Sequence, residues 1–490
     1  MKNVECFILN YFLSLQTNFL NHKDSMKYFL LPLGCQMNQS DTERVKTILQ
    51  GMGFTPTENE DEATILGIIA CSVRQKGIDK VYSRIKKWNE MRDHKNCITF
   101  VSGCILPADR ERFLKLFDLV FTMNDLPDLP DMIRQYGIYI PTSQQVNETI
   151  SQQVTVNIQK PLVPLFSKKD KINPSANMDR FWVIEPDHIS EFEAFIPIQN
   201  GCNKFCTYCA VPYTRGREVS RKSEDILTEL KDLVQKDYKL ITLLGQNVNS
   251  YGLDKKGEQI NFADLLRRIG EYGNSMNKEF WVYFTSPHPR DMSDEVIEVI
   301  SQYKCLAKQI HLPIQSGDNA MLDRMNRKHT IDDYRHIIHT IRRLIPEATI
   351  FTDIIVGFTG ETEEEFENSR KAMEEFKYNM AYIAQYSVRP GAVASTWADD
   401  VPKETKKKRY HILTDELMKH SLVYNQGLVG KTLKVIVNGF DRNKAYLTGY
   451  TEGKIVIRFK SNDKNLIGKI VKVEVTSATP LSIEGNLITE

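Results

Sequence analysis

The sequence predicts an α/β protein with an N-terminal open parallel-sheet domain, a central barrel of the triosephosphate isomerase type (full or partial), and a small all-β barrel at the C-terminus. Short apolar runs alternate with charged, helix-like segments from residue 27 to about residue 425. Residues 426–490 change to short runs of alternating character, separated by turn signals. A chain of 490 residues is also longer than one hydrophobic core usually supports, which agrees with several domains.

The N-terminal domain, residues 27–137, contains three apolar runs, and each run is followed by a cysteine. The runs are KYFLLPL, ATILGIIA and CITFVS, and the cysteines are Cys35, Cys71 and Cys104. Because the carboxyl ends of parallel strands meet at one edge of a sheet, we expect these three thiols to converge. Cys6, Cys97 and Cys305 have no such position, and we interpret them as core or incidental residues.

Two segments flank this domain and lack its pattern. Residues 1–26 are apolar in parts but interrupted by polar residues, and we interpret them as an N-terminal extension with Met26 as a candidate initiator. Residues 138–190 are rich in Gln, Ser, Asn and Lys and show no sustained period. This composition predicts a linker or a long surface excursion.

The central domain, residues 191–425, contains six further strand-like runs: AFIPIQ, KLITLLG, EFWVYFTS, QIHLPIQ, TIFTDIIVGF and AYIAQYSV. Helical patterns such as SEDILTELKDLVQ separate them, as in a barrel whose reactive face lies at the carboxyl ends of the strands. Residues at those ends are polar or glycine. They are Asn200 and Gly201, Gly245 to Asn247, Ser286 to His288, Gln315 to Gly317, Gly357 with Gly360 and Glu361, and Arg389 to Gly391.

Three cysteines in GCNKFCTYC, namely Cys202, Cys206 and Cys209, follow the first of these strands and therefore open on the reactive face. Three thiolates can hold a 4Fe-4S cluster and leave its fourth iron open to a small molecule, whereas electron-transfer clusters usually have four. A structural zinc site is the alternative, but it normally has four ligands in Cys-x-x-Cys pairs, and no second pair follows nearby. Sparse cysteines with this spacing indicate metal or redox use in a reducing compartment, which favours the cytoplasm.

The C-terminal domain, residues 426–490, has ten Lys and Arg against six Asp and Glu, within a chain of net charge +1. A small barrel with basic strands often binds RNA, and a solvated charged face is the alternative interpretation. No apolar run approaches the roughly 20 residues that a membrane span requires, so we expect no membrane association.

The segments CNKFCTYCAVPYTRGREVSR, LLGQNVNSYG, TSPHP, HLPIQSG and RPG resemble the radical S-adenosylmethionine enzymes of the methylthiotransferase family. Cys35, Cys71 and Cys104 match that family's second cluster site, and the tail resembles its TRAM RNA-binding domain. The resemblance runs from about Met26 to the C-terminus. Within the family, VPYTRGREVSR and LGQNVN are most similar to bacterial tRNA enzymes that methylthiolate isopentenyl-adenosine beside the anticodon.

This resemblance implies two 4Fe-4S clusters. Cys202, Cys206 and Cys209 would hold the cluster that binds S-adenosylmethionine, while Cys35, Cys71 and Cys104 would hold an auxiliary cluster carrying the sulfur. A radical would then remove hydrogen from carbon two of the adenine, a bond too inert for side-chain acid–base catalysis. We therefore expect no catalytic side chain beyond the clusters. Candidate cofactor-binding residues are Tyr208, Gly245, Gln246, Asn247, Ser286, Gln315, Gly357 and Arg389.

The resemblance also implies partners and leaves alternatives. The partners are the tRNA anticodon loop, a sulfur source, and an electron donor such as flavodoxin or ferredoxin, with the enzyme itself a monomer. One alternative is a sister enzyme acting on threonylcarbamoyl-adenosine of tRNA or on an aspartate of a ribosomal protein. Another is a non-catalytic iron–sulfur protein that binds RNA, which the polar strand ends disfavour.

Three residues, at two places in the chain, depart from the family pattern. Ile69 and Ala70 precede the second cluster cysteine where the family has Asn-Thr, and Thr359 replaces the usual proline in GFTGET. Ligation needs only the thiolate of Cys71, so we expect the auxiliary cluster to remain, with an altered potential. We expect Thr359 to loosen a turn without removing a ligand.

Overall fold

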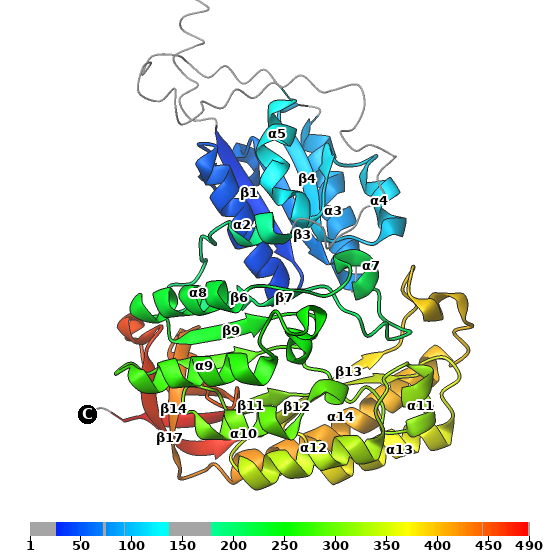
Figure 1. Cartoon of the computed structure of the whole chain (residues 1–490), viewed down its shortest axis with the longest axis vertical. Coiled ribbons are helices and arrows are strands. Elements are labelled where there is room, and N and C mark those ends of the chain that lie inside the picture. Colours follow the sequence, from blue (N-terminus) through cyan, green and yellow to red (C-terminus); the bar gives the residue numbers. More distant parts are fainter. Residues whose placement is uncertain (1–25, 72–74, 93, 137–177, 443, 489–490) are drawn as a thin grey trace, which may run out of the picture. The chain divides into compact units, whose positions relative to one another are not determined.

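The computed structural model describes residues 26–488 except 72–74, 93, 137–177 and 443. Contacts divide the chain into two compact units (Figure 1). The first contains the described residues before position 137 together with Asp179–Asp187, and the second contains Met178 and the chain from His188 onward. The expected N-terminal extension, Cys6 and most of the expected linker lie outside the described residues.

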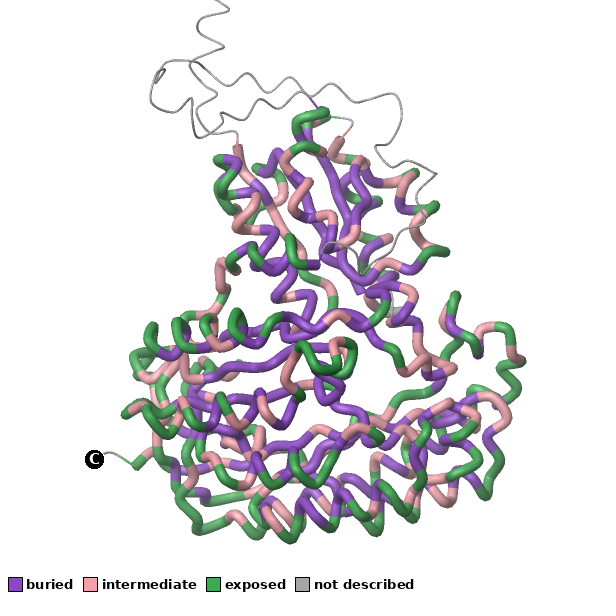
Figure 2. Tube along the Cα trace, in the orientation of Figure 1, coloured by how far each residue is buried: buried purple, intermediate pink, exposed green. Residues whose placement is uncertain are grey.

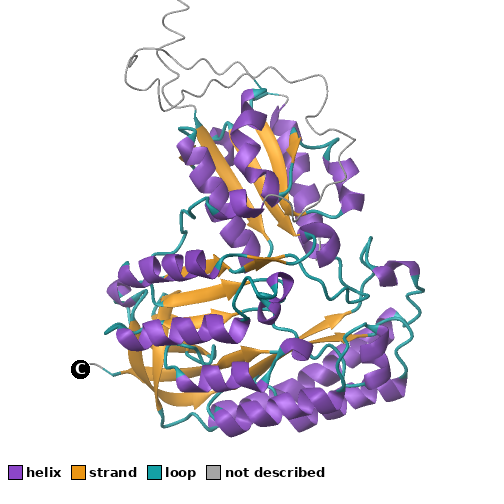
Figure 3. Cartoon of the chain, in the orientation of Figure 1, coloured by secondary structure: helices purple, strands orange, loops and turns teal. Residues whose placement is uncertain are grey.

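The first unit is built on a five-stranded parallel sheet in the order β2-β1-β3-β4-β5. Its two central long strands are buried over their whole length, as in sheets that helices cover on both faces (Figure 3). The three predicted strands are confirmed, whereas the two-residue strands β2 and β5 are too short to give a pattern. The strands are β1 (Lys27–Leu33), β2 (Thr55–Pro56), β3 (Ile65–Cys71), β4 (Ile98–Cys104) and β5 (Leu119–Val120), and the helices are α2 (Gln36–Gly51), α3 (Gln75–Arg92), α4 (Pro107–Phe113) and α5 (Leu129–Arg134).

The last part of the expected linker is ordered against α2. After helix α6 (Met178–Trp182), the Thr47 hydroxyl donates to the carbonyl oxygen of Glu185 at 2.6 Å. Lys46 pairs with Asp187 at 2.8 Å. These contacts explain why Asp179–Asp187 belongs to the first unit.

The second unit begins with six parallel strands in two sheets, β6-β9-β10 and β11-β12-β13, joined by an isolated bridge between Val282 and Leu306. This confirms the predicted barrel in its partial form, with β6 and β13 at the edges. The strands are β6 (Glu193–Pro197), β9 (Leu240–Leu244), β10 (Trp281–Phe284), β11 (Gln309–His311), β12 (Thr349–Val356) and β13 (Met380–Gln385), with a small hairpin of β7 (Gln199–Asn200) and β8 (Val219–Ser220) after the first of them.

Amphipathic helices cover the outer face of this half-barrel and form the main core with it (Figures 1 and 2). Alternate strand residues such as Ile241 and Leu243 point to the helices, because successive side chains of a strand face opposite ways. Side-chain caps fix several helix starts. At α12, for example, the Thr330 hydroxyl accepts from the backbone nitrogen of Asp333, and the Asp333 carboxylate accepts from the backbone nitrogen of Thr330. The helices are α7 (Val211–Arg215), α8 (Ser223–Gln235), α9 (Phe262–Ser275), α10 (Asp294–Gln302), α11 (Asn319–Arg324), α12 (Ile331–Leu344) and α13 (Glu363–Phe376).

A long helix, α14 (Lys403–Gln426), leads into a closed five-stranded barrel in the order β14-β15-β16-β18-β17. The closed barrel confirms the predicted all-β tail. Helix α14 and strand β18 were not predicted, and the buried charges Lys406 and Arg409 explain why α14 shows no amphipathic pattern. The strands are β14 (Thr432–Phe440), β15 (Tyr446–Thr451), β16 (Val456–Lys460), β17 (Ile470–Ala478) and β18 (Ser482–Leu487).

The C-terminal barrel packs against the amino-terminal ends of the central strands. Ile436 lies in one apolar cluster with Leu240 and Trp281, which are the first residues of β9 and β10. Thr349, which begins β12, donates to the carbonyl oxygen of Gly453 at 2.7 Å. The neighbouring Lys454 places its ammonium group 4.2 Å from the ring centroid of Tyr283. The C-terminal barrel therefore covers the end of the half-barrel that lies opposite the reactive face, and we call this packing the floor contact.

Candidate functional site

The cysteines of the first unit meet at one edge of its sheet, as predicted. Cys71 and Cys104 end β3 and β4 and are direct partners in the strand register. Cys35 follows β1, the other neighbour of β3, and a β-carbon at Gly34 would lie 3.0 Å from that of Cys71. Cys71 and Cys104 are buried and Cys35 is exposed. Three cysteines thus end or directly follow adjacent strands, on the edge where parallel sheets bind ligands.

Asn38, which the sequence analysis missed, holds this edge together. Its side-chain oxygen lies 3.3 Å from the backbone nitrogen and 3.4 Å from the sulfur of Cys35. Its nitrogen donates to the carbonyl oxygen of Ala70 at 2.8 Å. Gly103 has φ +101°, and a β-carbon there would lie 2.4 Å from that same oxygen, so the approach to Cys104 requires glycine.

The second trio lies in the loop after β6 and β7, also as predicted. Cys202 and Cys206 are buried and Cys209 is partly buried. Backbone bonds from Cys202 to Gly216 at 3.1 Å and from Cys209 to Cys206 at 2.9 Å shape the loop. Burial raises the pKa of Cys202 and of Cys209 to about 12. Such thiols ionise readily only when a metal replaces the proton, which fits three-thiolate iron ligation.

The end of β9 lies beside this loop. The side-chain oxygen of Gln246 accepts from the backbone nitrogen of Gly201 at 2.5 Å. The side-chain nitrogen of Asn247 donates to Asp291 at 2.9 Å, while its oxygen is buried and has no hydrogen-bond partner in the described part of the chain. Gly245 is tightly packed, because a β-carbon there would lie 3.0 Å from Val248. Of the three predicted residues, Asn247 presents an open acceptor.

Ser286 and Gln315 share an unusual backbone. Both follow strands of the half-barrel, and their φ angles are +57° and +71°. Left-handed non-glycine residues cost free energy and gather at functional sites. Ser286 is exposed, and the backbone nitrogen of Gln315 donates to the carbonyl oxygen of Asp353 at 2.9 Å.

Tyr208, Gly357 and Arg389 lie around one aromatic cluster that includes Phe358 and Tyr386. The ring centroids of Tyr208 and Phe358 are 6.4 Å apart. Gly357 has φ +69°, and its backbone nitrogen donates to Glu361 at 2.6 Å. In the same turn, the carbonyl oxygen of Thr359 accepts from Arg324 at 3.3 Å.

Three buried side chains lie behind the cysteine loop; His288 was among the predicted strand-end residues, whereas Arg327 and His329 were not predicted. Arg327 lies 3.5 Å from the sulfur of Cys206. The rings of His288 and His329 are perpendicular, with centroids 5.7 Å apart. Burial lowers both histidine pKa values, that of His329 to about 4, so both rings are neutral. Asn326 and Lys328, which flank Arg327, also adopt left-handed backbone.

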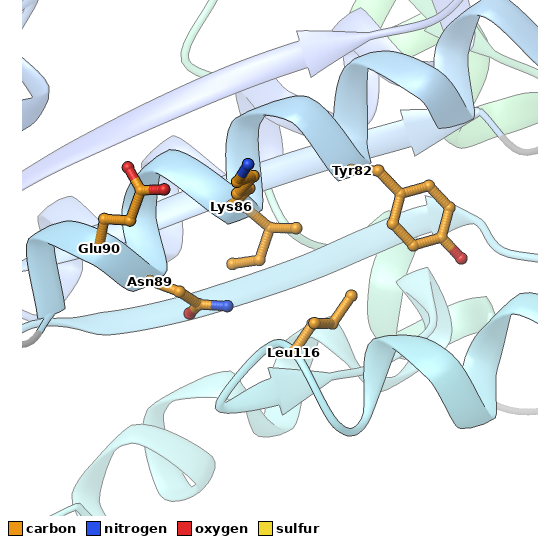
Figure 4. Close-up of a pocket in the computed structure, with 6 residues that line it drawn as sticks. Tyr82, Lys86, Asn89, Glu90 and Leu116 are labelled. Atoms are coloured by element: carbon orange, nitrogen blue, oxygen red, sulfur yellow. The ribbon is translucent and has the colours of Figure 1, made fainter.

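Other features of the described residues do not join these sites. Figure 4 shows a hollow on the first unit that contains no cysteine; it is lined by Tyr82, Ile85, Lys86, Asn89, Glu90 and Leu116. No three His, Cys, Asp or Glu side chains of the described chain are close enough to hold one metal ion. Within the same residues, no helix has the length and apolar character needed to span a membrane.

Three family descriptions match the chain. The Radical SAM superfamily matches residues 196–373, the TRAM domain matches residues 426–488, and the Uncharacterized protein family UPF0004 matches residues 27–123. The first match contains the loop of Cys202, Cys206 and Cys209. The UPF0004 match contains the three cysteines of the first unit.

Curated relatives match almost the whole chain. The tRNA-2-methylthio-N(6)-dimethylallyladenosine synthase of Parabacteroides distasonis is 37% identical over 473 residues, covering 95% of this chain and 96% of the relative. The protein of the same name from Carboxydothermus hydrogenoformans is 36% identical and covers 94% and 99%.

One solved structure supports the fold. The radical S-adenosylmethionine methyltransferase TsrM of Kitasatospora setae, solved with cobalamin and a 4Fe-4S cluster, has a TM-score of 0.50. The match covers 76% of this chain and 77% of that one at 12% identity.

Proposed function

The chain belongs to the methylthiotransferase family of the tRNA-2-methylthio-N(6)-dimethylallyladenosine synthases, and we propose that it places a methylthio group on carbon two of isopentenyl-adenosine in tRNA. The observation that carries this proposal is the pair of cysteine trios. Each lies at the carboxyl ends of parallel strands, one in each compact unit. A radical site alone would not require the second trio.

The radical S-adenosylmethionine family implies one 4Fe-4S cluster and S-adenosylmethionine. Cys202, Cys206 and Cys209 would hold that cluster, and Cys35, Cys71 and Cys104 would hold an auxiliary one. When bound, these groups supply a carbon-centred radical and the sulfur that the adenine receives. Three thiols at each site leave one iron open for S-adenosylmethionine or for sulfur.

The side chains at the carboxyl ends of the central strands would bind and orient the cofactor. Asn247 offers a buried amide oxygen with no partner among the described residues, which suits the ammonium group of methionine. Tyr208 and its aromatic cluster form an apolar wall next to the cysteine loop. Polar groups at these strand ends come from Ser286, Gln315 and Arg389. The backbone beside them is shaped by Gly245, Gln246 and Gly357. An apolar wall excludes water from a reactive radical.

The TRAM match and the names of the relatives support tRNA as the partner. In the structure, Tyr446 and Lys460 are cross-strand partners on the β15–β16 hairpin, and the guanidinium of Arg458 lies 5.1 Å from the Tyr446 ring centroid. Lys444 and Lys460 are exposed. Basic residues beside an aromatic ring suit the phosphates and unstacked bases of an anticodon loop.

Other partners follow from the chemistry. An electron donor such as flavodoxin or ferredoxin would reduce the first cluster, and a sulfur source would reload the second. Such an enzyme would work as a monomer in the cytoplasm, where the thiols stay reduced.

Nucleoside analysis of tRNA tests the function. A strain lacking this gene should keep isopentenyl-adenosine and lose its methylthio derivative, and the intact gene should restore it. A gene carrying Cys202→Ala should not. If methylthio-isopentenyl-adenosine stays unchanged and a threonylcarbamoyl derivative is lost, the sister activity replaces the proposal.

A further inference from the structure

Arg327 is buried behind the cysteine loop of the second unit, with 5% of its surface exposed. It joins three parts of the site. One terminal nitrogen lies 3.5 Å from the sulfur of Cys206 and 3.4 Å from the hydroxyl of Tyr208. The other donates to the carbonyl oxygen of Pro313, which follows β11, at 2.8 Å.

No carboxylate pairs with Arg327 among the described residues. Acidic groups of the surrounding segments bind other partners: Asp291 pairs with Lys204 at 2.5 Å, Glu365 pairs with Arg324 at 2.9 Å, and Glu218 accepts from the Ser250 hydroxyl at 2.8 Å. A buried cation without a counter-charge is strongly destabilising. The partners of Arg327 are instead a thiol sulfur, a phenol and a carbonyl.

The polar groups around Arg327 do not supply its counter-charge. The ring of His329 lies 3.3 Å from the backbone oxygen of Arg327, and His288 packs against His329. A histidine ring is either neutral or positively charged, so neither ring can balance the guanidinium. The charge that balances Arg327 must therefore arrive with the thiolates of the cysteine loop when they bind iron.

We propose that Arg327 is a positioning residue that raises the reduction potential of the cluster held by Cys202, Cys206 and Cys209. Reduction adds one negative charge to a buried group. A fixed cation and an N–H···S bond stabilise the more negative state more strongly, and hydrogen bonds to the sulfurs and net charge are established determinants of cluster potentials. A low effective dielectric enlarges the effect. This inference rests on the cluster assignment above.

The shape of arginine matters as well as its charge. Its planar fork reaches Cys206, Tyr208 and Pro313 together, and a lysine ammonium can keep the charge without all three contacts. Lys328 offers a matched control, because it is the next residue and is exposed to solvent. Removing its charge alters the local net charge without touching the thiols.

The test uses the full-length chain with Cys35, Cys71 and Cys104 changed to alanine, so that one cluster titrates. Iron per chain and the electron paramagnetic resonance signal of the reduced cluster are measured at a series of fixed solution potentials. Arg327→Gln should lower the reduced-to-oxidised ratio at least about tenfold, which is about 59 mV for one electron. Arg327→Lys should lower it less, and Lys328→Gln should change it less than about twofold.

An unchanged ratio in Arg327→Gln with a full iron content would overturn the proposal. If Arg327→Gln does not retain iron, Arg327→Lys is compared with Lys328→Gln instead. Equal reduced-to-oxidised ratios in these two variants would mean that the planar guanidinium of Arg327 has no effect on the reduction potential. The readout needs no tRNA, so a wrong substrate assignment leaves it unaffected. Absence of a reducible cluster in the protein with Arg327 intact would instead refute the cluster site itself.

Discussion

Asn38 donates a hydrogen bond to the backbone oxygen of Ala70 at 2.8 Å and so ties the first turn of α2 to the end of β3. The contact does not depend on the side chains of Ile69 and Ala70, which stand where the family pattern has Asn-Thr. The acceptor is a main-chain carbonyl, which every residue type provides at that position.

Asn38→Ala should weaken the N-terminal cysteine site. The buried carbonyl of Ala70 would lose its donor, at a cost of about 1–3 kcal/mol, and Cys35 would lose its anchor. The urea concentration at the midpoint of unfolding and the iron content should both be lower than in the parent protein. Gln39→Ala, on the neighbouring half-exposed position, should change neither; equal behaviour of the two variants would contradict the role of Asn38.

Iron content should report two separate clusters. The reconstituted protein should hold about eight irons, and Cys202→Ala or Cys71→Ala should each leave about four. Cys305→Ala is the matched control, because Cys305 is also buried but lies against the carbonyl oxygen of Ile269 at 3.9 Å. A parent protein with about four irons would reject the auxiliary cluster.

Removing residues 427–490 should destabilise the second unit. The C-terminal barrel covers Leu240, Trp281 and Tyr283, and uncovering large apolar side chains costs about 1.5–3 kcal/mol for each that becomes fully exposed. Thermal unfolding of the truncated chain should begin at a lower temperature. An unchanged unfolding temperature would show that the floor contact contributes little.

The RNA face is better tested by point substitutions. Lys444→Glu with Lys460→Glu should weaken tRNA binding and reduce the slope of log affinity against log salt by about 1.5, because two phosphate contacts are lost. Lys371→Glu, on the exposed side of α13, serves as the control. Filter binding at several salt concentrations measures both quantities, and equal slopes for the two proteins would exclude this face.

Arg409→Met should destabilise the glycine turn beside the aromatic cluster. Arg409 pairs with Glu361 at 2.7 Å, and both side chains are buried. Breaking such a pair costs about 3–5 kcal/mol, and Glu361→Gln in the same chain should recover part of it.

The loss of stability in Arg409→Met should depend on pH. Burial raises the pKa of Glu361. A raised carboxyl pKa favours the folded state at low pH, so stability falls as pH rises from the unfolded to the folded pKa. The deficit of Arg409→Met should therefore be smaller near about pH 5 than near about pH 8. Denaturant titrations at both values check the sign.

Much of the fold and both cysteine trios could be predicted, because strand periodicity and the placement of cysteines at strand ends are local signals. Arg327 could not, since it lies 121 residues from Cys206 and only the closure of the half-barrel brings them together. Asn38 was hidden for a different reason: it lies three residues from Cys35, but its second partner is a carbonyl on β3. The floor contact was also missed, because it joins the first residues of the central strands to the C-terminal barrel, which is distant in the sequence.

That floor contact can form only when synthesis of the chain is nearly complete. Leu240, Trp281 and Tyr283 leave the ribosome well before Ile436 and Lys454, and domains fold as their residues emerge. Until the last strands are made, the half-barrel carries an uncovered apolar end that chaperones or neighbouring chains can bind. A nascent chain truncated before β14 would expose the same surface, so closure of the floor distinguishes finished molecules from fragments.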